Sequence, residues 1–389
     1  MRLSFLLIAL VIAQSADAQR RNPTRTQSIQ PCEPITTQPG GTDSRTSGTT
    51  GSQNPWTNPR GQILVCDSNT GSPKPPSKAP ATFTLQKQTT HRVWSGFWWP
   101  TDPQRSPHLF DSPGPLDKYD SFVGTTTRTM EQTQHSSPGA SMAGYQGHCD
   151  GWSVSSVLYN EPVRAVVASK TRWLVLPVNQ RFEPGDVKGL LAALWNGFVW
   201  GKDSGGGAAG GIRDPSDLQA VDFHKLLLFY ISQNNLPLVV NLSPDFGPVW
   251  NYPCDGFKMT GTQVAGTSNW NITVDLDCAD DAVDWNYIGR KAYTDNIRAS
   301  YTVTAKDPQN WQEPGLSAQW SDPGKHPWWI FCPIIKATGS PQEPLRSSPE
   351  YHHPYANADF KNLVEGLQQV SSGQTDSWTS GNVSVTVAK

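Results

Sequence analysis

The pattern of hydrophobic and polar positions divides the chain into a polar N-terminal region and a patterned remainder. Residues 19–80 are dominated by Thr, Ser, Pro, Gly, Gln and Arg, and only residues 61–66 have the apolar content of a strand. Such a composition buries too little apolar surface to offset the entropy of ordering the chain. We therefore expect a disordered linker or propeptide over residues 19–80 and a folded domain over residues 81–370.

Short apolar runs and helical spacings predict the elements of this domain. We expect strands at residues 82–85, 164–169, 173–177, 236–241, 271–277 and 299–304, and within the Trp-rich stretch 320–332. Helices are expected from about Cys149 to Glu161, from 187 to 195 with Asp186 as the cap, and from 358 to 370. Residues 114–120 are interpreted as a turn and 371–389 as a flexible tail. The mixture predicts an α+β fold.

The first residues have the pattern of an export signal. A short basic start at Met1 and Arg2 precedes a mostly apolar run over residues 3–11, and small residues at Ala16 and Ala18 suit a signal peptidase. We predict a signal peptide over residues 1–18 and a secreted protein, extracellular or in the cell wall. The apolar run is too short for a membrane anchor, and no later run approaches the required length, so no membrane span is expected.

Composition and charge narrow the function classes. The formal net charge is -2 and there is no long basic run, so nucleic acid is not an expected partner. Hydrophobic residues make up 36% of the chain, which is low for a chain that is folded throughout. The 16 tryptophans are interpreted mainly as core or cleft walls, with sugar binding as the alternative.

Export changes how the six cysteines are interpreted. Disulfide pairing is the default in an oxidising compartment. The cysteines are Cys32, Cys66, Cys149, Cys254, Cys278 and Cys332. If Cys149 is free, we expect Cys32 to pair with Cys66 and Cys254 with Cys278. That leaves Cys332 unpaired, paired between chains or masking Cys149, and the sequence does not fix the connectivity.

Cys149 stands in a glycine-rich motif, residues 147–152 (GHCDGW), at the start of a predicted helix. Unpaired N–H groups and the helix dipole at such a position favour an anion and lower the pKa of a thiol. Cys149 is therefore a candidate nucleophile. The alternative is a buried or disulfide-bonded structural cysteine.

A cysteine nucleophile needs a base and a group that orients the base. Of the eight histidines, only His224 stands in a regular apolar context with a polar-ended strand soon after it. We predict that His224 pairs with Cys149 and that either Asn241 or Asp245 orients it. The alternative for His224 is a core histidine. This order of residues is shared by papain-like peptidases and transglutaminases, in which the cysteine begins a helix packed on a sheet.

Six short motifs in order carry a resemblance to a known family. They are residues 94–100 (WSGFWWP), 114–120 (GPLDKYD), 147–152 (GHCDGW), 185–191 (GDVKGLL), 223–224 (FH) and 249–253 (VWNYP). Over roughly residues 94–329 the chain resembles the transglutaminase elicitor family of secreted microbial proteins. The resemblance implies a papain/transglutaminase-like core with an extra β-rich C-terminal part. It also implies protein-glutamine gamma-glutamyltransferase activity through a Cys149 thioester. Asn241 departs from the family, which carries an aspartate in this strand.

Other polar and aromatic residues complete the predicted site. Substrate-cleft walls are expected from Trp94, Trp98, Trp99, Trp152 and Trp250. Glycosylation sequons begin at Asn241, Asn271 and Asn382, and the last two are the expected glycan sites. No cofactor or metal is expected. The acidic cluster over residues 275–284 lacks the glycine and ligand spacing of a calcium loop and is interpreted as a solvated turn.

Three functions follow from these residues. The first is a secreted transglutaminase that joins glutamine and lysine side chains of protein substrates, cell-wall proteins among them. The second is a papain-like cysteine peptidase or glutamine deamidase, in which water resolves the thioester. The third is a non-enzymatic cell-wall or carbohydrate-binding protein.

Overall fold

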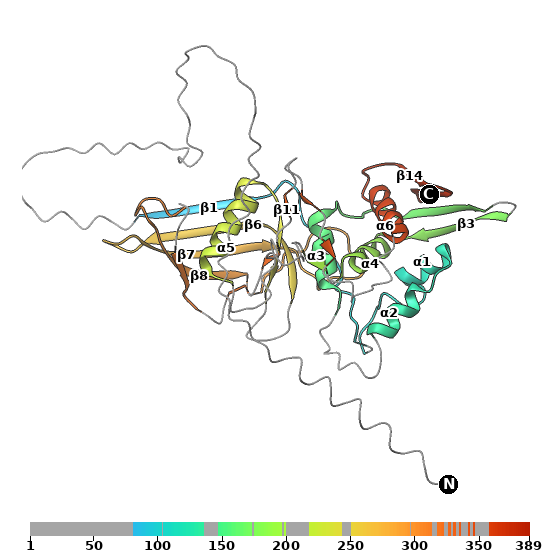
Figure 1. Cartoon of the computed structure of the whole chain (residues 1–389), viewed down its shortest axis with the longest axis horizontal. Coiled ribbons are helices and arrows are strands. Elements are labelled where there is room, and N and C mark those ends of the chain that lie inside the picture. The colour runs from blue at the N-terminus through green and yellow to red at the C-terminus, as the bar shows by residue number, and fades with distance from the viewer. Residues whose placement is uncertain are drawn as a thin grey trace, which may run out of the picture. The chain divides into compact units, whose positions relative to one another are not determined.

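The computed structural model describes a chain of helices and antiparallel sheets, an α+β architecture (Figure 1). The described residues are 81–102, 104–135, 147–172, 175–196, 198–199, 218–242, 250–295, 297–312, 317–322, 326–327, 330–331, 334–335, 341–342, 345–346 and 358–389. The predicted signal peptide and linker, Cys32, Cys66, Cys332 and Asp245 lie outside them. No helix within these ranges is long and apolar enough to cross a membrane.

The larger sheet is built around one long strand, β6. Its strands are β1 (Thr82–Gln88), β5 (Leu238–Asn241), β6 (Asn251–Gln263), β7 (Asn269–Cys278), β8 (Arg298–Thr304), β9 (Ser317–Trp320) and β10 (Ile330–Phe331). The order is β10-β5-β6-β7-β8-β9, and β1 pairs with the later part of β6. Cys254 and Cys278 form the expected disulfide between β6 and β7.

A smaller sheet contains the C-terminal residues. It consists of β2 (Val166–Arg172), β3 (Val175–Phe182), β14 (Ser377–Ser380) and β15 (Val383–Val387), in the order β14-β15-β2-β3. The predicted flexible tail over residues 371–389 is therefore wrong. Valines alternate with polar residues in β15, and Val385, which is fully buried, pairs with the equally buried Ala168. This alternation is typical of a strand, but the Ser- and Gly-rich residues around it obscure the pattern in the sequence.

Short strands form two further two-stranded sheets. They are β4 (Phe198–Val199), β11 (Ile334–Ile335), β12 (Pro341–Gln342) and β13 (Leu345–Arg346). β4 pairs with β13, and β11 pairs with β12.

Several helices differ from the sequence prediction, and two of them have a local explanation. The helices are α1 (Pro115–Val123), α2 (Thr127–His135), α3 (Cys149–Leu158), α4 (Pro184–Trp195), α5 (Ala220–Leu227) with its π-helical continuation η1 (Leu228–Gln233), and α6 (Ala358–Ser371). α1 replaces the predicted turn because Pro115 suits a first helical position and Leu116, Tyr119 and Phe122 bury one face. α4 begins before its predicted cap: Asp186 lies inside it and accepts the Glu183 N–H at 2.7 Å.

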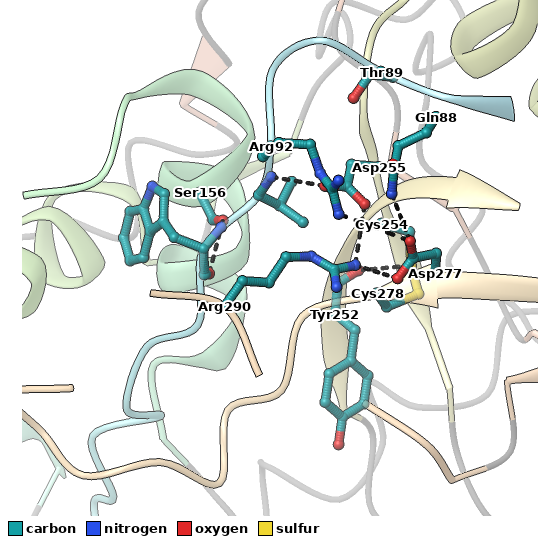
Figure 2. A network of polar contacts seen from close by, with 12 residues as sticks. Gln88, Thr89, Arg92, Ser156, Tyr252, Cys254, Asp255, Asp277, Cys278 and Arg290 are labelled. Atoms are coloured by element: carbon teal, nitrogen blue, oxygen red, sulfur yellow. Dashed lines mark hydrogen bonds and ion pairs between the residues drawn. A yellow bond between two sulfur atoms is a disulfide. The ribbon is translucent and has the colours of Figure 1, made fainter. Parts of the chain in front are cut away.

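A polar network ties the start of β6 to α3, as Figure 2 shows. Buried Asp255 accepts bonds from Arg92 Nε at 2.6 Å and Arg290 at 3.1 Å, and Asp277 on β7 also binds Arg290. Two residues after Arg92 the chain reaches α3. There Ser156 Oγ accepts the Trp94 N–H at 2.7 Å and donates to the Trp94 carbonyl at 2.9 Å. Because Asp255 and Ser156 are satisfied by these bonds, the network fixes α3 against this end of the sheet.

A close contact between two helices sets the first turn of α3. A side chain at Gly151 would collide with the backbone carbonyl of Ala192 in α4. The absence of a Cβ thus lets α3 lie directly on α4, whose residues are buried along its length. The packing of α3 on α4 therefore explains the second glycine of GHCDGW, independently of any chemical role.

Candidate functional site

Cys149 is the first residue of α3, as the sequence predicts, and His148 is the cap residue before it. The residue is only 7% exposed, and its thiol is free, unlike the other described cysteines. α3 packs against β5 and β6. Cys149 therefore lies where a helix start meets the beginning of β6.

Two asparagines lie beside the thiol. Asn251, the first residue of β6, places its side-chain Nδ2 3.6 Å from Cys149 Sγ. Asn241 at the end of β5 donates from Nδ2 to the Trp250 carbonyl at 3.0 Å and to Asn251 Oδ1 at 3.4 Å. Its Oδ1 is buried and has no hydrogen-bond partner among the described residues. Asn241 is thus linked to Cys149 through Asn251. Its side-chain amide is buried and therefore inaccessible to glycosylation.

The electrostatics of Cys149 oppose the predicted thiolate. Burial raises the pKa of the Cys149 thiol to about 12, and the nearby carboxylates of Asp150 and Asp281 add to the rise. Backbone and side-chain hydrogen bonds from Asn251 act in the other direction. Desolvation therefore outweighs the helix dipole, and the resting group is a neutral thiol.

Asp281 is a buried carboxyl that the sequence prediction placed in a solvated turn. It follows β7, whose end is held at β6 by the Ala279 N–H bond to the Pro253 carbonyl at 2.9 Å. The residue is 5% exposed, and Oδ2 has no hydrogen-bond partner among the described residues. Burial, followed by the charge of Asp280, raises the pKa of Asp281 to about 7. The solvated-turn interpretation is wrong here because strand pairing and the disulfide at Cys278 draw this turn inward.

A second buried pair supports the start of α3. His148 Nε2 lies 2.9 Å from Glu131 on α2, and both side chains are almost fully buried. The other ring nitrogen, Nδ1, lies 3.2 Å from the Trp99 carbonyl. Burial opposes protonation, but the Glu131 carboxylate prevails and raises the pKa of His148. This pair was not predicted, because α2 is polar and has no clear periodic signal in the sequence.

His224 lies away from Cys149. It belongs to α5, and its Nδ1 is 2.9 Å from the Tyr301 hydroxyl, with Trp311 packed edge-on against the ring. Burial lowers the pKa of His224 to about 4. Tyr301 pairs with Ile272, which pairs with Gly261 near the end of β6, whereas Cys149 contacts Asn251 at the beginning of β6.

The predicted pairing of Cys149 with His224 is therefore not formed. The two side chains lie near opposite ends of a strand of 13 residues. Asn241 consequently orients no described histidine, and Asp245 lies outside the described residues. His224 fits the alternative of a core histidine, because an apolar helical face is also the pattern of residues that pack inward.

The predicted cleft tryptophans separate into two groups. Trp94, Trp99 and Trp152 are fully buried core residues, so their assignment to a cleft wall is wrong. Trp98 and Trp250 pack edge to face with centroids 5.5 Å apart. The carbonyl of Trp98 accepts the His148 N–H at 2.7 Å, and that of Trp250 accepts the Asn241 amide. Trp98 and Trp250 therefore flank the Cys149 site.

Several carboxylates of the acidic cluster over residues 275–284 form ion pairs. Asp275 pairs with Arg298, Asp277 with Arg290, and Asp280 with Lys291 at 2.7 Å. Within the described part of the chain, no three His, Cys, Asp or Glu side chains converge as metal ligands.

The arrangement at Cys149 consists of a neutral thiol at a helix start, an amide donor on its sulfur and two unsatisfied buried oxygens, Asn241 Oδ1 and Asp281 Oδ2. Comparisons with protein-family models, curated proteins and solved structures give no match to this chain.

Proposed function

We propose that this chain is a cysteine-dependent acyltransferase that joins protein glutamine to lysine side chains, with Cys149 as the nucleophile. The observation that carries the proposal is that a free cysteine begins α3 and has an amide donor, Asn251, on its sulfur. The finer fold assignment, a papain/transglutaminase-like core, is part of the same proposal. It is supported by the packing of α3 on β5 and β6 of an antiparallel sheet.

The chemistry follows from the groups at this position. The Cys149 sulfur attacks the glutamine carboxamide, ammonia leaves, and a lysine amine resolves the thioester. Asn251 is a donor for the oxyanion, a contribution on the order of 3 kcal/mol. The raised pKa of the resting thiol means that the proton must leave the sulfur as the bond forms.

The residues around Cys149 take different roles from those that the sequence predicts. His224 has no catalytic role in the proposal because it lies near the other end of β6 from Cys149. The His148 and Glu131 pair holds the helix start and so positions the nucleophile. Trp98 and Trp250 shield the site from water, which favours an amine over hydrolysis.

Incorporation of a fluorescent primary amine into a glutamine-containing donor protein tests the proposal. We expect wild type and His224→Gln to label the donor and Cys149→Ala to leave it unlabelled. Equal labelling by wild type and Cys149→Ala would contradict the proposal. Release of ammonia or peptide fragments without amine incorporation would assign the site to a deamidase or peptidase. Polysaccharide binding that is retained in Cys149→Ala, with no turnover, would favour the non-enzymatic function.

A further inference from the structure

The acyl transfer proposed above needs a group that accepts the thiol proton, and no described histidine is bonded to Cys149. His148 is engaged by Glu131 and the Trp99 carbonyl, and His224 by Tyr301. His91 is bonded to the Ser156 carbonyl at 2.8 Å. The described polar groups that interact with the thiol are Asn251, Asp150, Asp281 and Tyr252, whose hydroxyl stays protonated because its pKa is raised. Neither an amide nor a neutral tyrosine can take a proton in the neutral range, so among these described groups the candidates are the two carboxylates.

Of the two carboxylates, Asp281 has the properties of a base. Asp150 is partly exposed, and its Oδ1 already accepts the Gly151 N–H at 2.7 Å. Asp281 is more than nine-tenths buried, and its Oδ2 has no hydrogen-bond partner among the described residues. The Ala279 to Pro253 bond fixes its backbone beside the start of β6, two residues from Asn251. A buried oxygen left without a partner is costly, and such a cost is typical of functional groups.

We propose that Asp281 is the acid–base residue of the Cys149 site and serves in the position where cysteine acyltransferases commonly use a histidine. The inference rests on the proposed function and adds to it the group that moves the protons. It also explains why the thiol is kept neutral: Cys149 carries the proton that Asp281 removes.

The steps balance without any further group. In acylation the Cys149 S–H proton passes to the Asp281 carboxylate, the sulfur bonds to the carboxamide carbon, the C–N bond breaks, and the proton leaves with ammonia. In transfer the amine loses a proton to Asp281, the new C–N bond forms, the C–S bond breaks, and the proton returns to sulfur. When Asp281 accepts a proton its charge disappears, which removes one of the causes that raise the pKa of the thiol.

The groups that face Asp281 set its protonation near neutrality. Burial disfavours its charge, and the neighbouring carboxylate of Asp280 acts in the same direction. Lys291, which pairs with Asp280, opposes them. Tyr252 and Tyr293, stacked 3.9 Å apart between centroids, have their pKa raised in part by Asp281 and stay neutral. The balance places the pKa of Asp281 at about 7, in the range suited to acid–base catalysis.

Two measurements on the full chain test Asp281, with the exposed Asp284→Asn as the matched control of charge. The first is amine transfer against pH. We expect the wild-type transfer rate to rise with pH through about pH 7. Asp281→Asn should transfer the amine about 100-fold more slowly and show no such rise, while the rate of Asp284→Asn stays within twofold of wild type. The second is alkylation of Cys149 by iodoacetamide against pH, followed on the Cys149 peptide by mass. Removing the Asp281 charge should move the alkylation midpoint to lower pH.

The combination of results separates the inference from a structural role and from the proposed function. Slower transfer together with a more acidic thiol in Asp281→Asn is the expected result. Because disruption of the site would also expose the thiol and lower the alkylation midpoint, urea unfolding must show that the variant is at least as stable as wild type. Transfer within threefold of wild type, or an unchanged midpoint, would overturn the role of Asp281. If wild type transfers no acyl group, the proposed function fails by that result. The alkylation midpoint of Asp281→Asn would then still show whether the charge of Asp281 raises the pKa of the Cys149 thiol.

Discussion

The two ends of β6 each hold a buried, chemically capable side chain, but in contrasting surroundings. At the beginning, Cys149 has acidic neighbours, an amide donor on its sulfur and two buried oxygens without a partner among the described residues, Asn241 Oδ1 and Asp281 Oδ2. At the far end, His224 is enclosed by the aromatic rings of Tyr301 and Trp311, and its Nδ1 is bonded to a hydroxyl. Both ends hold a buried polar atom without a partner among the described residues, His224 Nε2 at the far end. The first arrangement, however, gathers acidic and amide groups around a thiol, whereas the second favours a neutral ring in a core.

The difference shows that residue type is a weaker indicator of chemistry than the state of the neighbours. A histidine is the usual partner of a catalytic cysteine, yet this histidine has a lowered pKa in an apolar shell. An aspartate after a strand is usually solvated, yet Asp281 is buried with a raised pKa. Each contrast can be tested by changing one residue and measuring either stability or transfer.

The largest expected effect is a stabilisation by Asp281→Asn. The Asp281 pKa is about 7 in the folded chain, whereas an unfolded aspartate titrates near 4. The folded state therefore binds the proton more tightly, and wild-type stability should fall as pH rises from about 4 through 7. The loss is up to about 4 kcal/mol, complete above pH 7. Urea unfolding at pH 8 should show Asp281→Asn to be more stable than wild type by a large part of this amount.

The pH dependence provides the control for this gain. At pH 4 both folded proteins carry a neutral group at position 281, so most of the difference should disappear. Asp284→Asn should change stability by less than about 0.5 kcal/mol at either pH. An Asp281→Asn variant that is no more stable at pH 8 than at pH 4, relative to wild type, would show that the buried carboxylate carries no such cost.

The second effect concerns His224, whose contribution to the free energy of unfolding rises with pH, in contrast to that of Asp281. The folded ring titrates near 4 and the unfolded ring near 6.5, so the unfolded state binds more protons between these values. Stability from this group is present above pH 6.5 and should be lost as pH falls to 4, by about 3 kcal/mol. His224→Gln should remove this part of the pH slope in urea unfolding. An unchanged slope would mean that the ring is protonated in the fold.

The third effect tests the amide on the sulfur. Asn251→Leu removes the Nδ2 donor 3.6 Å from Cys149, and we expect amine transfer to fall by about 100-fold, equivalent to about 2.7 kcal/mol. The exposed Asn271→Leu on β7 is the matched control and should stay within twofold. A loss of less than threefold in Asn251→Leu, with Cys149 still alkylated normally, would remove Asn251 from the oxyanion site.

Much of the secondary structure is predictable from the sequence, because alternation and helical spacing are local. β1, β5, β7 and β8 lie close to their predicted positions, and the α6 bounds differ from the prediction by one residue at its end. The start of α3 at Cys149 follows from its glycine-rich approach. α2 and the C-terminal strands were missed, since polar composition hides their periodicity.

The site is less predictable, because it depends on the register between distant strands. Nothing local to Asp281 shows that pairing of β6 with β7 and the Cys254–Cys278 disulfide bring it to the start of β6. Likewise, the sequence order of Cys149 and His224 does not reveal that the histidine's neighbour Tyr301 is in register with the far end of β6. Residue order along a chain constrains the participants in a site but not their distances.

The smallest expected effect completes the comparison at the His224 end. Tyr301→Phe removes the hydroxyl 2.9 Å from His224 Nδ1 and keeps the buried ring that packs against Phe223 and Trp320. Loss of one buried hydrogen bond should lower the unfolding free energy by about 1 kcal/mol. Because this end of β6 takes no part in the proposed chemistry, amine transfer at 25 °C should stay within twofold of wild type. A tenfold loss of transfer in a variant that is still folded would show that the two ends of β6 are coupled, and the separation of roles argued above would have to be abandoned.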